Sequence, residues 1–225
     1  MLMFTLALAQ ERDPADAPDS DALLASAQAQ VRNLPGCWAM QGDSRDRWDA
    51  GIFGEGDRHW VLAGRLVDGL WQDFTFTAAP DNQTPPDEND KRRSMFGRYP
   101  DAEADQEAGR QSVLQALSDD VSLQYVERDG AGWRLTRTLR GGTALKNTLV
   151  LHYDAALRPW RWAVSIVDPV VVKGDRGKAK IVRMEAVLEA DERGAPRSET
   201  FTGTFARWPF KVDVSAVTRW TAGAC

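Results

Sequence analysis

The C-terminal half of the chain alternates between apolar and polar residues along a succession of short segments. The apolar residues of the last segment share one parity: Val212, Val214, Ala216 and Trp220. The polar residues between them, Asp213, Ser215 and Arg219, take the other parity. Because successive side chains of a strand point to opposite faces of a sheet, this pattern predicts a half-buried β-strand.

Segments of this kind recur along the chain, separated by turn sequences such as Asp129-Gly130. We expect strands at 38–42, 48–53, 59–67, 70–77, 121–128, 132–140, 143–153, 160–167, 178–189, 198–208 and 212–221. A polar turn through Asp43, Ser44 and Asp46 is expected between the first two. A sheet of about ten strands tends to close or roll up, because this removes exposed edges. The pattern therefore predicts an all-β fold, an antiparallel meander forming a barrel or a rolled half-barrel.

Two helices and one long loop interrupt the strands. Residues 22–32 and 105–117 carry partial apolar stripes with helical spacing. Residues 79–105 are rich in proline and charge and have no sustained period, so we expect an excursion loop there. This loop is either a lid over the barrel mouth or a solvated insertion. The expected organisation is a flexible acidic leader at 10–21 followed by a single domain at 22–225.

Residues 1–9 are expected to be the end of a secretory signal peptide. An apolar stretch leads into Ala7-Leu8-Ala9, which fits the small-x-small rule for cleavage before Gln10. A basic region and part of the usual apolar length are missing, which a start codon placed too late would explain; the alternative is an ordinary frayed N-terminus. No other stretch has the roughly 18 apolar residues that a membrane-spanning helix needs. We therefore expect a secreted or periplasmic protein without a membrane span.

The composition is that of one globular domain with a sizeable core. The chain has 225 residues, of which 43% are hydrophobic. Its net charge of −5 disfavours a nucleic-acid partner. Nine tryptophans either pack the core and the barrel rim or line a ligand cavity. The candidates for an aromatic ligand site are Trp60, Phe74, Phe76, Trp133, Trp162, Phe201 and Phe205.

The chain has two cysteines, Cys37 and Cys225. An even pair in an exported chain suggests a disulfide, and the alternative is two unrelated thiols. In a closed barrel the first and last strands are neighbours, so these two residues could meet. The bridge would close a very long loop, which is worth ~4–5 kcal/mol in the chain-entropy model.

Gly36-Cys37-Trp38, preceded by a short helix and Leu34, resembles the Gly-x-Trp element that opens the first strand of lipocalins and related calycin barrels. The resemblance implies a structural role for Trp38 and Arg219, with the arginine packing across the indole in a cation–π contact at the barrel base. It covers these residues and the strand rhythm. The chain departs from the family in lacking a C-terminal helix and in its excursion, and the strand pattern equally allows an open half-barrel of the lipoprotein-carrier kind.

Catalytic, metal and cofactor signatures are absent from the sequence. His59 and His152 lie on predicted strands with no nearby cysteine or paired carboxylate, so their spacing does not make a zinc site. The chain has no Gly-x-Ser-x-Gly motif for a nucleophilic serine. We therefore expect no catalytic residue, no metal and no cofactor.

The leading functional prediction is an exported, non-catalytic binding or carrier protein for a small apolar or amphipathic ligand, such as a lipid or a pigment. It depends on architecture, since a rolled sheet of eight or more strands can hold one ligand. One alternative is a barrel enzyme, an isomerase or lyase for an apolar substrate, with His59, Glu185 or Arg183 inside the barrel. The other is an envelope interaction module with a filled core and no ligand.

Overall fold

The computed structural model describes residues 14–32, 36–81, 111, 113–118, 121–139, 147–166, 170–174, 177–207 and 210–225. The expected signal peptide at 1–9 and most of the excursion loop at 79–105 lie outside these residues. The end of the second expected helix is present at 113–118, and the first expected helix is α1 (Ser20–Arg32).

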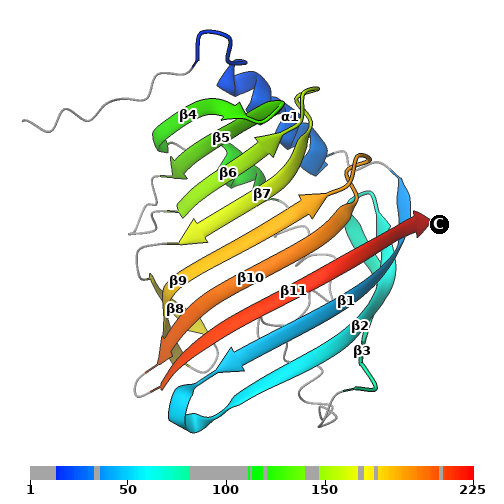
Figure 1. The fold of residues 1–225 in the computed structure, drawn as a ribbon, viewed down its shortest axis with the longest axis vertical. Helices are drawn as coiled ribbons and strands as arrows, with labels where there is room; N and C mark the ends of the chain where they lie inside the picture. The colour runs from blue at the N-terminus through cyan, green and yellow to red at the C-terminus, as the bar shows by residue number, and fades with distance from the viewer. Residues whose placement is uncertain are drawn as a thin grey trace, which may run out of the picture.

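Eleven strands form one antiparallel sheet (Figure 1). They are β1 (Cys37–Asp49), β2 (Glu55–Val67), β3 (Leu70–Ala78), β4 (Val121–Asp129), β5 (Gly132–Leu139), β6 (Asn147–Tyr153), β7 (Pro159–Ile166), β8 (Val170–Gly174), β9 (Gly177–Ala190), β10 (Pro196–Arg207) and β11 (Phe210–Ala224). Their order is β3-β2-β1-β11-β10-β9-β7-β6-β5-β4, and β8 pairs with β9 off this path. Among the described residues β3 and β4 are the two ends and do not pair with each other. The predicted all-β meander is confirmed, in the open half-barrel form.

β1 corrects one expectation. The polar residues at 43–46 predict a turn, but β1 continues through them as a single strand. Ser44 and Asp46 are buried because each has a partner on the same face of the sheet. The Ser44 hydroxyl lies 2.8 Å from the Thr218 hydroxyl, and the Trp60 indole N–H donates to Asp46 Oδ1 at 2.7 Å. Polar groups with such partners can be buried within a strand at little cost. The short strand β8 was not predicted at all.

Residues paired directly across antiparallel strands project from the same face of the sheet. One such row crosses nine strands: Trp60, Ser44, Thr218, Glu199, Leu188, Trp162, Leu151, Leu135 and Val126. Leu23 and Ala27 of α1 form a buried cluster with the last three residues of this row. We call the face that α1 covers the inner face and the opposite one the outer face. In Figure 1, α1 passes behind the strands at the β4–β7 end, so the view is onto the outer face.

Hydrogen bonds also fix α1 to the sheet. The buried Tyr153 hydroxyl donates to the carbonyl oxygen of Leu23 at 2.9 Å, and burial raises the pKa of this tyrosine. The Ser26 hydroxyl donates to the carbonyl oxygen of Leu157 at 2.9 Å. These two hydrogen bonds join α1 to the end of β6 and to the turn that follows it, so they set where α1 lies on the inner face.

A buried arginine holds the second helical segment in place. Arg137 of β5 donates from Nη1 to the carbonyl oxygens of Ala116 and Leu117, at 3.0 and 2.7 Å. Its Nε donates to Gln124 Oε1 at 2.8 Å. The last carbonyls of a helix lack partners within the helix, and a basic side chain satisfies them here.

The predicted disulfide is confirmed between Cys37 and Cys225, whose Cα atoms lie 5.5 Å apart. The expectation relied on barrel closure, but β1 and β11 are neighbours within an open sheet. Their pairing runs from Trp38 opposite Ala224 to Asp49 opposite Asp213. The covalent link therefore lies at one end of an already complete strand pair.

Replacing both cysteines by serine is expected to lower the free energy of unfolding substantially, by up to about 5 kcal/mol in the chain-entropy model. The physical reason is that the bridge joins residues separated by 188 positions and so restricts the unfolded chain. Urea unfolding followed by tryptophan fluorescence measures the difference. Reduction should shift the native protein toward the urea midpoint of the Cys37→Ser/Cys225→Ser variant and leave that variant unchanged; equal midpoints for oxidised and reduced native protein would contradict the prediction.

Candidate ligand-binding face

The inner face gathers most of the aromatic residues that the sequence singled out. The strand register and packing place six of the seven candidates there: Trp60, Phe74, Trp133, Trp162, Phe201 and Phe205. The side chain of Phe76 lies outside the described ones. The six do not form one cluster, because they are spread over both ends and the middle of the sheet.

One group packs at the β1–β3 end. Its buried members are Met40, Trp60, Leu62, Leu66 and Trp220. The Trp71 ring lies 5.1 Å from Phe74, edge to face, and 4.9 Å from Trp220. Trp71 and Phe74 can both point inward because Asp73 between them is an irregularity in β3, with a φ of 51°. On the outer face Asp73 accepts a hydrogen bond from Arg65 Nε at 3.0 Å.

A second group lies under α1 at the β4–β7 end. Trp133 is buried there, and the Arg128 guanidinium lies 3.9 Å from the centre of its ring. Trp162 is half-buried and packs against the same cluster. Trp133 is thus part of the core that fixes α1, while Trp162 lies at its margin, toward the middle of the sheet.

The middle of the inner face is apolar and half-buried. Phe201 and Phe205 of β10 stack with their ring centres 6.3 Å apart and their planes 15° from parallel. Gly203 lies between them, where a Cβ atom would come within 2.9 Å of the Phe205 ring and 3.1 Å of the Phe201 ring. Glycine at this position therefore allows the two rings to stack over the strand. Both rings are half-buried, so they retain apolar surface that a ligand could cover.

Buried polar groups cross the same face next to this apolar strip. Burial raises the pKa of Asp46, and the hydrogen bond from Trp60 offsets part of the effect. The hydroxyls of Ser44 and Thr218 bond to each other. Thr218 is paired in turn with Glu199, which brings a carboxyl group to the middle of the inner face.

Glu199 has an unusual environment for a glutamate. Its side chain is exposed to solvent, yet the surrounding protein desolvates it strongly enough to raise the pKa of the carboxyl group. Both conditions hold together for a group on a concave surface, where protein surrounds the carboxyl but water still reaches it. Sequence reasoning missed this residue, although it shares strand parity with Phe201 and Phe205. That shared parity was the signal that could have found it.

The predicted contact between Arg219 and Trp38 is wrong. Arg219 pairs with Asp43, on the outer face, whereas Trp38 shares the inner-face parity of Met40. The guanidinium of Arg193, from the turn between β9 and β10, lies 4.7 Å from the centre of the Trp38 ring instead. The cation–π contact exists, but a turn residue supplies it, because strand parity turns Arg219 away.

The three groups named for a barrel enzyme lie on the outer face. Glu185 pairs with Thr202 and is exposed, as is Arg183 two residues earlier. His59 lies opposite Arg45 on β1, also outside. A ligand on the inner face would therefore not contact these three side chains.

His59 is held between two carboxylates on the outer face. Its Nε2 lies 2.6 Å from Asp43 Oδ2, and its Nδ1 lies 2.6 Å from Asp81 Oδ1. The hydrogen bond with Asp43 is the largest cause of a raised His59 pKa, and the bond with Asp81 adds to it. The hydrogen bond between His59 and Asp81 also lowers the pKa of Asp81. Arg45 Nη2 lies 3.7 Å from Asp81 Oδ2.

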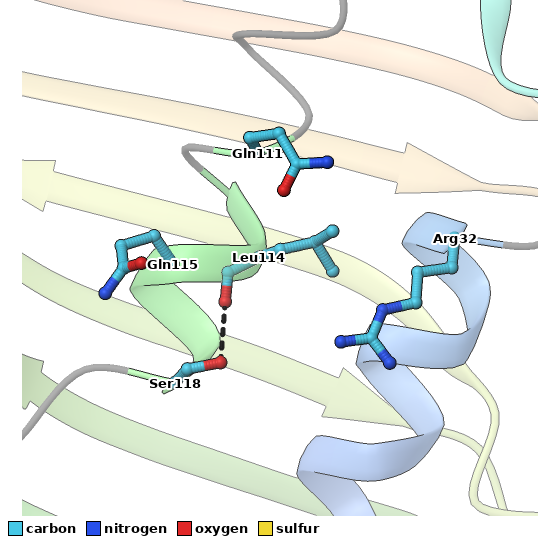
Figure 2. A pocket seen from close by; sticks show the side chains of 5 residues that line it. All are labelled: Arg32, Gln111, Leu114, Gln115 and Ser118. Carbon is cyan, nitrogen blue, oxygen red and sulfur yellow. Dashed lines mark hydrogen bonds between the residues drawn. The ribbon is translucent and has the colours of Figure 1, made fainter.

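A separate hollow of about 390 Å³ lies between the end of α1 and the helical segment at 113–118. Figure 2 shows the side chains that line it. Its lining residues are Arg32, Gln111, Leu114, Gln115 and Ser118. Four of these five side chains are polar, and the Ser118 hydroxyl donates to the carbonyl oxygen of Leu114 at 2.9 Å. The lining is therefore less suited to an apolar ligand than the aromatic strip on β10.

Within the described segments, no group of three or more histidine, cysteine, aspartate or glutamate side chains is placed to hold a metal ion. No helix in the described part of the chain is long and apolar enough to cross a membrane.

Comparisons with known proteins give structural similarities only. No protein-family model matches the chain, and no curated protein sequence matches it significantly. Among solved structures, a LolA superfamily protein from Nitrosomonas europaea aligns with a TM-score of 0.35 at 10% identity, over 93% of this chain and 94% of that chain. A Pseudomonas aeruginosa MucA/MucB complex aligns with a TM-score of 0.26 at 10% identity, over 92% and 100%. MucB in complex with MucA(peri) aligns with a TM-score of 0.24 at 10% identity, over 90% and 94%. TM-scores below 0.5 do not establish a common fold.

The His59 contacts predict a pH-dependent contribution to stability. Because the folded pKa lies above the usual value of 6.5, the protonated ring stabilises the fold fully below that value, and the contribution is lost as the pH rises through the raised pKa. The difference in unfolding free energy between native protein and His59→Gln should be larger at about pH 6 than at about pH 9. Urea titrations at the two pH values test this. In an Asp43→Asn background the dependence should weaken; a difference independent of pH would contradict the assignment.

Proposed function

We propose that this chain is an exported, non-catalytic carrier for a small amphipathic ligand of the lipid type, bound on the inner face of the half-barrel. The observation that carries the proposal is the half-buried, stacked pair Phe201 and Phe205. The pair lies between the two buried clusters, on the face that also presents Trp162. An apolar strip with a few polar groups beside it has the composition of small-molecule sites.

The disulfide supports the location outside the cytoplasm. Stable disulfides form in oxidising compartments and are rare in the cytosol of most organisms. Cys37 and Cys225 are bonded, and no cysteine is left unpaired because the chain contains these two alone. A protein whose fold includes this bond is suited to the periplasm or the extracellular space.

The enzyme alternative has less support in the form that uses His59, Glu185 or Arg183 as the reacting groups. It needs ionisable groups with shifted pKa values that face the substrate. His59, Glu185 and Arg183 face outward, so a substrate on the inner face would not contact them. The other alternative, an interaction module without a ligand, is tested by the ligand-binding measurements below.

The neutral apolar dye N-phenyl-1-naphthylamine is expected to bind the oxidised protein with a rise in fluorescence. The double variant Phe201→Ala/Phe205→Ala should weaken binding by about tenfold or more, because it removes apolar contact area worth roughly 1.4 kcal/mol or more. A fluorescence titration of each protein gives the dissociation constants.

Val217→Ala is the matched control for this experiment. Val217 is an exposed apolar residue on the outer face of β11, opposite Thr200 of β10. Its replacement should leave dye affinity unchanged. If the native protein takes up no dye, the inner face is filled and the interaction module replaces the carrier; if the control weakens binding as much as the double variant, the site is not on the inner face.

A further inference from the structure

Among the described residues, Glu199 is a carboxyl group on the inner face whose raised pKa no basic group offsets. Glu199 is paired directly with Thr218 of β11 and Leu188 of β9, and neither residue is charged. Within the described residues, the group that lowers its pKa is the Trp220 indole, and no lysine or arginine does so. Arg197, two residues earlier on β10, is exposed to solvent as Glu199 is, and it is not among the groups that lower the pKa of Glu199. Among the described residues, this carboxylate is thus partly desolvated and has no basic group that offsets the effect, which is costly unless a partner is supplied.

The Trp220 indole is a second polar group at this position without a settled partner. Trp220 is 9% exposed, and its Nε1 has no hydrogen-bond partner within the described residues. Trp220 lies two residues beyond Thr218 on the inner face of β11, and Thr218 is paired with Glu199, so the indole is a diagonal neighbour of the carboxyl group. The ring is fixed from behind, because a Cβ atom on Gly42 would lie 2.6 Å from it. A rigid donor beside a carboxylate can orient one oxygen and leave the other for a ligand.

The aromatic residues next to Glu199 favour a positive charge. Phe201, two residues along β10 on the same face, stacks on Phe205. Trp220 lies on the other side and contacts the Trp71 ring. The faces of aromatic rings attract cations, and ammonium groups are bound where such rings and a carboxylate converge. An anionic head group would instead meet the Glu199 carboxylate with the same charge.

We propose that Glu199, oriented by Trp220, binds an ammonium group on an alkyl chain, whose apolar part lies along Phe201 and Phe205. The ammonium donates hydrogen bonds to the carboxylate oxygen that Trp220 leaves open. The chain then covers the half-buried rings of β10. This inference rests on the proposed function, since it names the chemical class of ligand for the same face.

The test uses three ligands with the same decyl chain, each below its micelle concentration: decylammonium, decanoate and decyl maltoside. Isothermal titration of the full, oxidised protein is expected to show decylammonium binding about tenfold or more tightly than decanoate. Glu199→Gln should weaken decylammonium binding by about tenfold and abolish the preference, while the affinity for decyl maltoside stays the same. Trp220→Phe keeps an aromatic ring but removes the N–H, and should reduce the preference with a smaller effect than Glu199→Gln.

Glu185→Gln is the matched control, because it removes a carboxylate from the outer face of the neighbouring strand β9. It should bind all three ligands as the native protein does, and circular dichroism should show that each variant is folded. Equal binding of the three ligands by the native protein, or an unchanged preference in Glu199→Gln, would overturn the ammonium site and leave the carrier function intact. Failure of all three ligands to bind native protein would overturn both.

Discussion

The pairing of β1 with β11 is the constraint on which the rest of the structure depends. It joins the first three strands to the C-terminal meander, and its register runs without interruption from Trp38 opposite Ala224 to Asp49 opposite Asp213. A shift of one residue would turn every side chain of β1 to the other face. The disulfide at one end of this pair and the Ser44–Thr218 hydrogen bond within it both require the observed register.

The same register decides which chemistry reaches the inner face. It places Ser44 opposite Thr218, and Thr218 is paired in turn with Glu199, so three polar residues lie in one row across the inner face. Where a partner lies within hydrogen-bonding distance, the polar group is structural. Glu199 differs because partial desolvation raises its pKa and, among the described residues, no basic group offsets this effect. The proposed binding site on this face therefore depends on which of its polar groups are already paired.

The strand rhythm was sufficient to predict the sheet, because alternating burial is a property of each segment by itself. Val214, Ala216 and Trp220 are buried as their parity indicates. The turn expected at 43–46 was wrong, since the burial of Ser44 and Asp46 depends on partners from β11 and β2 that no local pattern contains. Arg193 over Trp38 was missed for the same reason, as it comes from a distant turn. Among the site residues, parity could have indicated Glu199, but its lack of a counter-charge required the neighbouring strands.

The open form of the sheet bears directly on binding. A closed barrel would bury its interior by joining its edges, whereas this sheet must cover its inner face by other means. α1 covers the β4–β7 end through Leu23 and Ala27, and the β1–β3 end packs its own aromatic rings together. Between them Phe201 and Phe205 stay half-buried, although full burial of their remaining apolar area would add stability at about 25 cal/mol per Å². This half-buried apolar surface beside the Glu199 carboxyl is the feature on which the proposed binding of an amphipathic ligand depends.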